Sequence, residues 1–104
     1  MGGYRLTPNA REGLHDILEY VNRRFGAPVA DQVIERLVGA FEFVAANPGA
    51  GHRREDLTQD DRIRFWSVGP TLIAYRSGTH DWIEVLLVER GERDWERILE
   101  EEDL

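Results

Sequence analysis

The chain lacks cysteine and lysine altogether, and it lacks any long apolar run. Because there is no thiol, disulfides and thiolate metal sites are excluded, and the composition suits a reducing compartment. A membrane-spanning helix needs about 18 or more consecutive apolar residues, and the chain has no such stretch. The first residues also lack an apolar signal core. These absences lead us to expect a cytoplasmic protein without a membrane partner.

The missing lysine leaves arginine as the only strong base, with 13 basic residues against 20 acidic ones and a net charge of −7. Part of that acidity is concentrated in the tail at residues 100–103, so the rest of the chain is closer to neutral. Nonspecific binding of nucleic acid depends on neutralising phosphates with basic side chains. The acidic balance therefore argues against broad nonspecific binding of nucleic acid. We also expect no direct sequence-specific binding of DNA or RNA.

The residues that are present suit one compact domain spanning residues 1–104. Apolar residues make up 41% of the chain and charged residues 32%, which is typical of a soluble globular protein. A chain of this length can bury a single core. No internal repeat or low-complexity linker divides it.

Two helices are predicted in the first half of the chain, after a short alternating strand at residues 4–6. Thr7-Pro8 supplies an N-cap and a first helical residue, and Gly26 ends this helix. A second helix begins at Pro28 and ends at the Asn-Pro-Gly sequence of residues 47–49, because proline cannot continue the hydrogen-bond ladder. The short connection makes the pair an antiparallel hairpin. Apolar residues at helical spacing form the stripes Ala10, Leu14, Ile17, Leu18, Val21, Phe25 and Ala30, Val33, Ile34, Leu37, Val38, Phe41, Val44, Ala45.

Three strands are predicted in the second half, at residues 62–68, 71–76 and 82–89. Short turn sequences separate them, so they form an antiparallel meander. The third run is the most apolar and is expected to be the central strand. Asp94 then caps a short helix whose Trp95, Ile98 and Leu99 dock back on the domain.

This order predicts an α+β fold: an N-terminal strand, an antiparallel helical hairpin packed on a small antiparallel sheet, and a short C-terminal helix. We expect the hairpin to cover one sheet face and the other face to have no helices of its own to cover it. Strand alternation puts Arg62, Arg64 and Trp66 on one side of their strand. The arginines of the strands and of the turn after the last strand are expected to share the exposed face and its edge.

Four segments carry a resemblance to a known family. They are "YRLTPNAREGLHDILEYV", "FEFVAANPGAGHRREDL", "RFWSVGPTLIAYR" and "IEVLLVERGERDWERIL". In this order they resemble the ParE-type toxins of the RelE/ParE superfamily, the toxin halves of bacterial type II toxin–antitoxin modules. One position departs from the pattern. Many ParE-like sequences carry histidine near the end of the last strand, where this chain has Arg90.

The resemblance implies a cytosolic toxin, of the kind linked to plasmid stabilization, held inactive by a ParD-like antitoxin that wraps the hairpin and the sheet. It implies poisoning of DNA gyrase for ParE-like members and cleavage of messenger RNA on the ribosome for RelE-like members. A third possibility is a nontoxic relative that only binds an antitoxin.

The residues themselves favour binding over ribonuclease chemistry. Cleaving RNA needs a base, an acid and a cation, and arginine is a poor base because its pKa is too high. Tyr75, Arg76 and His80 are the remaining candidates, with Tyr75 better explained as a packed sheet aromatic and His80 as an exposed turn residue. The histidines lack metal-ligand spacing, and no phosphate loop or nucleophile motif is present. We expect no catalytic residue, metal site or cofactor.

Two interaction surfaces are predicted instead, because arginine and aromatic residues are enriched at interface hot spots. The candidates for contacting the target are Arg62, Arg64, Arg76, Arg90 and Arg93. The candidates for contacting the antitoxin are Leu14, Leu18, Leu37, Phe41, Trp66 and Trp82.

Overall fold

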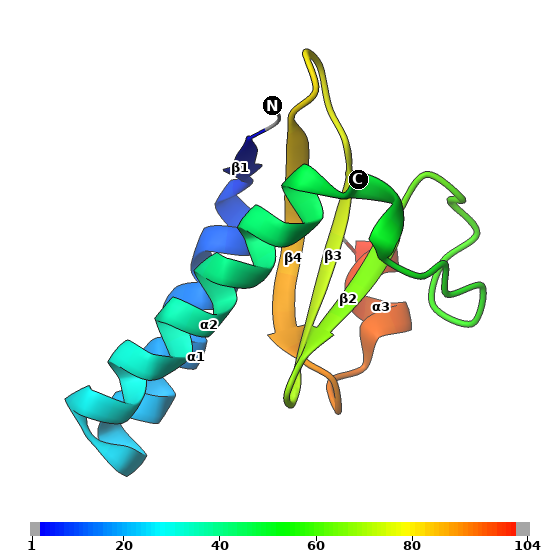
Figure 1. Cartoon of the computed structure of the whole chain (residues 1–104). Coiled ribbons are helices and arrows are strands. Elements are labelled where there is room, and N and C mark those ends of the chain that lie inside the picture. The colour runs from blue at the N-terminus through cyan, green and yellow to red at the C-terminus, as the bar shows by residue number, and fades with distance from the viewer. Residues whose placement is uncertain (1–2, 102–104) are drawn as a thin grey trace.

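The chain runs through one short strand, two long helices, three strands and a short helix (Figure 1). The computed structural model describes residues 3–101, except the side chains of Glu96 and Glu101, so Glu102 and Asp103 of the acidic tail lie outside the described residues. This α+β order is the predicted one. The elements are β1 (Tyr4–Leu6), α1 (Pro8–Phe25), α2 (Ala27–Ala46), the 3-10 turn η1 (Pro48–Ala50), β2 (Arg64–Val68), β3 (Thr71–Ser77), β4 (Ile83–Arg90) and α3 (Trp95–Glu101).

The helical hairpin begins and turns at the residues that local chemistry indicates. The Thr7 hydroxyl accepts a hydrogen bond from the Ala10 N–H at 3.2 Å, which satisfies one of the free donors of the first turn. Gly26 ends α1 with a φ of 94°, a conformation that residues with a Cβ rarely adopt. The next residue already belongs to α2. The predicted caps are therefore confirmed.

The sheet has four strands in the order β1-β4-β3-β2, so the apolar third run is an inner strand, as predicted. The pairs β2–β3 and β3–β4 are antiparallel, whereas β1 pairs with β4 in parallel. A parallel pair needs a long crossover connection, and the helices and strands from α1 to β3 form this connection. A bulge between Ala74 and Tyr75 shifts the β3–β4 register. As a result Leu86 and Leu87, which are consecutive, both join the core beneath α3.

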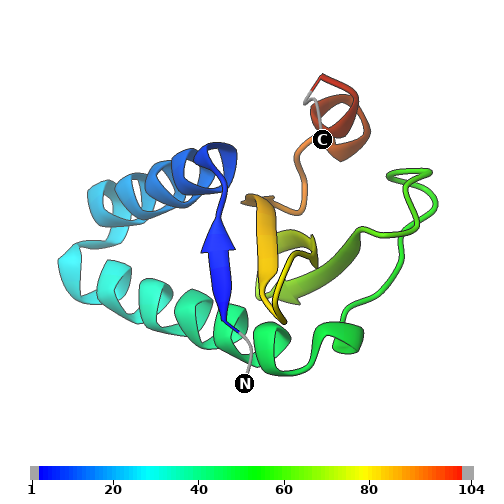
Figure 2. The ribbon, with the colours of Figure 1, turned by 90° about the horizontal axis from the view of Figure 1, so that it is seen from above.

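The domain has a core on each face of the sheet, and this corrects the expectation that one face is left open. Figure 2 shows α1 and α2 on one side of the sheet and α3 on the other. Phe41, Leu37, Val85 and Val88 belong to the first core. In the second core the rings of Phe65 and Trp95 meet edge to face at 6.0 Å. Asp94 caps α3 as predicted, since its Oδ1 accepts the Arg97 N–H at 3.3 Å.

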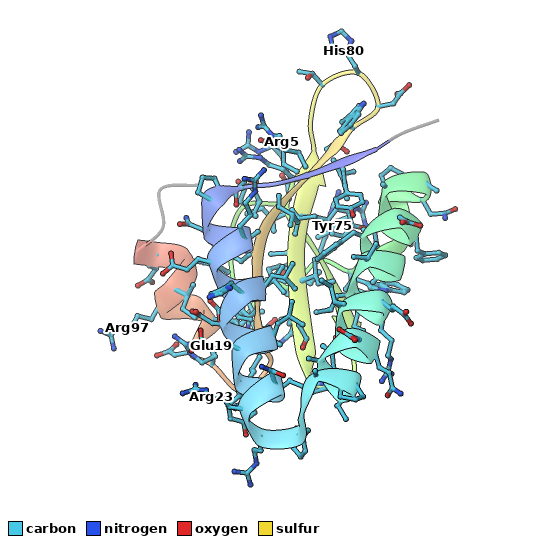
Figure 3. All side chains as sticks on the ribbon, turned by 90° about the vertical axis from the view of Figure 1, so that its left-hand side faces the viewer. Arg5, Glu19, Arg23, Tyr75, His80 and Arg97 are labelled. Carbon is cyan, nitrogen blue, oxygen red and sulfur yellow. The ribbon has the colours of Figure 1, made fainter. Side chains whose placement is uncertain are left out.

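Tyr75 ties the loop after α2 to the sheet. Its ring is buried on β3 (Figure 3), and its hydroxyl donates to the Pro48 carbonyl and accepts from the Gly51 N–H, both at 2.8 Å. Arg64 holds the same loop by donating to the Gly51 carbonyl at 3.0 Å. Burial raises the pKa of the Tyr75 phenol. The interpretation of Tyr75 as a packed sheet aromatic is thus confirmed, and its hydroxyl has a structural role.

Candidate functional site

A groove of about 350 Å³ opens between the linked ends of the two long helices and the end of the sheet. Figure 1 shows why it exists: the helical hairpin leans away from the strands, and its linked end extends beyond them. The turn between β2 and β3 and the last residue of β4 form the opposite wall. The apolar lining includes Ile17, Val21, Phe25, Val29, Val33, Leu37 and Val68.

The groove exposes apolar side chains that lie on the inward face of the hairpin. Phe25 is 58% exposed and Val29 is 37% exposed. Both occupy the linked end of the hairpin, where the sheet no longer lies beneath the helices. Apolar side chains that surround a hollow are typical of binding sites for apolar groups. The groove is therefore suited to an apolar partner segment.

The rim of the groove carries a cation held by an aromatic ring. The guanidinium of Arg90 lies over the ring of Tyr20, 3.8 Å from its centroid, a favourable cation–π geometry. The interaction with Arg90 is the largest cause of a lowered pKa for the Tyr20 phenol, and the charge of Arg24 lowers it further. Glu92, which pairs with Arg90 at 3.4 Å, opposes this shift. Arg90 and Arg24 thus place positive charge beside the Tyr20 phenol.

The predicted antitoxin contacts do not gather at this groove. Leu37 contributes to its lining, but Leu37 and Phe41 are 1% and 0% exposed and belong to the core. Leu14 and Leu18 are half-buried on α1. Two tryptophans lie elsewhere. Trp66 stacks on His52 and meets the ring of Phe43 at a tilt, and Trp82 lies at the turn between β3 and β4.

The sequence contained a partial signal for the groove. Phe25 and Val33 belong to the predicted stripes, and their position beside the helix connection is apparent from the order of residues. What the stripes lack is any indication of where the sheet ends. For that reason the sequence does not indicate that Tyr20 and Val29 lie at a groove.

The predicted target-binding arginines lie on different parts of the molecule, so the expectation of one shared face is wrong. Thr71 pairs with Arg90 in the β3–β4 ladder, and Arg76 pairs with Glu84 at its other end. Arg90 faces the hairpin, while Arg64 reaches the loop at Gly51. The β-bulge and the ends of the strands separate side chains that simple alternation groups together.

The other three arginines form ion pairs near the α3 face. Arg93 pairs with Glu89 at 3.4 Å, Arg76 with Glu84 at 3.4 Å, and Arg62 with Asp60 at 2.9 Å. The pKa of the Asp60 carboxyl is lowered to about 2, chiefly by its hydrogen bonds with Arg62 and to a smaller extent by the charge of Arg76. Glu84 also pairs with Arg5 of β1. A charged network thus links β1, β3, β4 and the loop before β2.

The three histidines lie on different segments of the structure. His15 pairs with Glu19 at 3.3 Å on the exposed side of α1, as expected for residues one turn apart. His52 stacks on Trp66, and His80 lies at the β3–β4 turn. No group of three or more potential metal ligands is found in this part of the chain. Within the same residues, none of the helices is long and apolar enough to cross a membrane.

Comparison with known proteins identifies relatives across most of the chain. The model of the ParE toxin family, described as the toxin of the parDE type II toxin–antitoxin system, matches residues 4–95. Toxin ParE1 of Caulobacter vibrioides is 31% identical over 88 residues, which cover 85% of this chain and 88% of that toxin. A chain from the chromosomal ParDE TA system of P. aeruginosa has the same fold, with a TM-score of 0.70 and 21% identity. That match covers 88% of this chain and 98% of the other.

Proposed function

The chain belongs to the family of ParE toxins of type II toxin–antitoxin systems, and from this premise we propose that it arrests growth by binding DNA gyrase and is neutralised by a ParD-like antitoxin. Binding, without bond chemistry by this chain, stabilises an intermediate of gyrase on DNA. The antitoxin places an amphipathic segment in the groove beside α1 and α2.

The groove is the observation that supports an antitoxin site. Phe25 and Val29 are apolar, exposed and adjacent to a hollow of about 350 Å³. An amphipathic helix presents apolar residues at three- and four-residue spacing and fits such a groove. Arg90 at the rim suits a carboxylate on the same segment, because charged groups at a rim give specificity.

Two features support inhibition by binding over cleavage of RNA. The Tyr75 hydroxyl, a candidate acid for a ribonuclease, is occupied by the Pro48 carbonyl and the Gly51 N–H. Arg90 lies on a tyrosine ring and beside Glu92, and arginine does not transfer protons near neutral pH. The side chains at the groove are therefore better suited to recognition than to general acid–base catalysis.

Inducing this chain alone in a bacterium with a DNA-damage reporter tests the proposal. We expect growth arrest with the reporter switched on, because a stabilised gyrase–DNA intermediate leads to DNA breaks. Growth arrest with a silent reporter and a halt in translation would support the ribonuclease alternative. Unimpaired growth would identify a nontoxic relative.

The groove assignment is tested by Val29→Asp. The cognate antitoxin can be obtained by selecting clones of the source genome that restore growth. We expect Val29→Asp to remain toxic but to need at least about tenfold more antitoxin, because a carboxylate in an apolar interface loses its hydration.

Ile34→Asp is the matched control for that experiment. Ile34 lies on the same helix and is exposed to the same 37% as Val29, but it does not line the groove. Its aspartate variant should be neutralised like the wild type. Equal neutralisation of both variants would place the antitoxin elsewhere on the toxin.

A further inference from the structure

The turn between β3 and β4 projects beyond the rest of the domain, at the end of the sheet opposite the groove. Figure 1 shows this turn rising above the other elements, and Figure 3 places His80 at its outermost point. The register confirms the separation, because Ser77 pairs with Ile83 beside the turn and Thr71 pairs with Arg90 beside the groove. β4 has eight residues, so the two sites lie roughly 25 Å apart.

The turn keeps two side chains where glycine would be easier to accommodate. His80 has a φ of 54° and Asp81 a φ of 63°, and the Trp82 N–H donates to the Thr79 carbonyl at 3.1 Å. Positive φ at both central residues is the pattern of a type I′ turn, which favours Asn-Gly. Within residues 3–101 these are the only residues other than glycine with positive φ. Histidine and aspartate adopt this region more readily than most residues other than glycine, and such conformations are enriched at turns and at functional sites.

Trp82 follows the turn and presents a firmly placed aromatic surface. The residue is 50% exposed. The indole lies against the backbone of Gly3, where an added Cβ would come within 3.0 Å of the ring. Hollows of about 330 and 520 Å³ flank the indole, the first toward the end of α2 and the second toward Arg5 and His80. The indole is therefore already held in position and can insert into a pocket of a partner protein.

Arg5 adds a fixed cation beside the indole. Its side chain is 67% exposed and pairs with Glu84, which Arg76 contacts from the other side at 3.4 Å. This network holds the Arg5 guanidinium in place while leaving much of it open to a partner. Tryptophan and arginine are the residue types that most often dominate binding energy at protein interfaces.

The shape and charge of this turn indicate a folded protein as the partner. A projecting turn is convex, so its partner has to supply the concave surface, which an extended peptide does not. A nucleic acid is disfavoured, because the carboxylates of Asp81 and Glu84 lie beside the indole in a chain of net charge −7. We expect the partner protein to have an apolar pocket for the indole and a carboxylate that pairs with Arg5.

We propose that the toxin binds its target protein through the tip surface, which is formed by Arg5, His80, Asp81 and Trp82. This surface is separate from the groove. This inference rests on the proposed toxin function. It differs from the arginine candidates for target binding, since none of those five arginines belongs to the tip surface. It also separates target contacts from antitoxin contacts on opposite ends of β4.

Two variants test the tip surface, with growth arrest and binding to purified DNA gyrase holoenzyme as readouts. Trp82→Ala removes the indole and is expected to weaken gyrase binding at least about thirtyfold, as at an interface hot spot, and to relieve growth arrest. The double variant His80→Asn, Asp81→Gly keeps the turn type and is expected to melt at a higher temperature, yet to lose toxicity. A rise in stability together with a loss of toxicity excludes misfolding as the cause.

Phe43→Ala is the matched control, because Phe43 is an aromatic residue of similar exposure, 44%, that contacts Trp66 and does not line the hollows beside Trp82. It should stay toxic. If the wild type, Trp82→Ala and the double variant all arrest growth fully, the proposal for the tip surface is wrong and the proposed toxin function still stands. If the wild type arrests growth without binding gyrase, the proposed target fails, and the growth of the two variants still decides on the tip. A wild type that does not arrest growth refutes both proposals.

A duplex DNA fragment without gyrase is the remaining probe. If the wild type binds the bare duplex and Trp82→Ala binds it more weakly, the tip surface contacts nucleic acid. That result would contradict the assignment of a protein partner. We expect the wild type and the variants to bind the duplex equally weakly.

Discussion

Replacing Phe41 with alanine is expected to lower the free energy of unfolding by about 4 kcal/mol. Phe41 is fully buried, and its ring lies 5.3 Å from that of Tyr4. Removing it leaves a cavity between α2 and the sheet that a close-packed interior cannot fill. For a domain of this size, the melting temperature should fall by roughly 20 °C. Urea denaturation and thermal melting of the isolated chain measure both quantities.

Phe43→Ala provides the comparison, since it removes the same side chain two residues later on the same helix. Phe43 is 44% exposed and meets Trp66 at 5.2 Å, so the loss should be about 1 kcal/mol or less. The pair distinguishes a core residue from a surface one. If Phe41→Ala leaves the isolated toxin as stable as the wild type and weakens only its antitoxin complex, Phe41 is an interface residue after all.

Gly13→Ala is expected to destabilise the domain by about 3 kcal/mol, although alanine is the better helix former. Gly13 lies where α1 crosses β4, and a Cβ there would come within 2.1 Å of the Val88 carbonyl oxygen. That oxygen belongs to the backbone of an inner strand and cannot rotate away. The helix has to move off the sheet, which loosens the packing of the first core.

Gly39→Ala tests the opposite case on α2. No heavy atom lies within 4 Å of the position that a Cβ would occupy on Gly39. The substitution should therefore stabilise the domain by about 0.5–1 kcal/mol, because alanine loses less backbone entropy in a helix. Opposite signs for the two substitutions are expected in denaturation curves. A stabilising Gly13→Ala would show that α1 can shift on β4 at little cost.

Much of the fold was predictable because its signals are local. Thr7 and Pro8 start α1, Gly26 ends it, and the Asn-Pro-Gly sequence stops α2, each through the geometry of its own residue. The apolar third strand run indicated an inner strand. The parallel pairing of β1 was not predicted, because nothing in Tyr4–Leu6 specifies which strand it joins.

The candidate site was less predictable, because it depends on segments far apart in the chain. Helical spacing placed Phe25 and Phe41 in the same kind of stripe, yet one is 58% exposed and the other is buried. The difference comes from where the sheet ends beneath the hairpin. The expectation that the arginines share one face is wrong for a related reason. The bulge at Tyr75 and the strand ends decide which way each side chain faces.

The sequence by itself determined the elements, their order and the family, since caps, turn residues and apolar periodicity act over a few neighbouring residues. Only the tertiary structure decided which apolar side chains are core and which line a groove. It also brought Tyr20 to Arg90, and Gly3 and Arg5 to the turn at Trp82. Those contacts join residues about 70 to 80 positions apart, and they exist because β1 and α1 pack against β4.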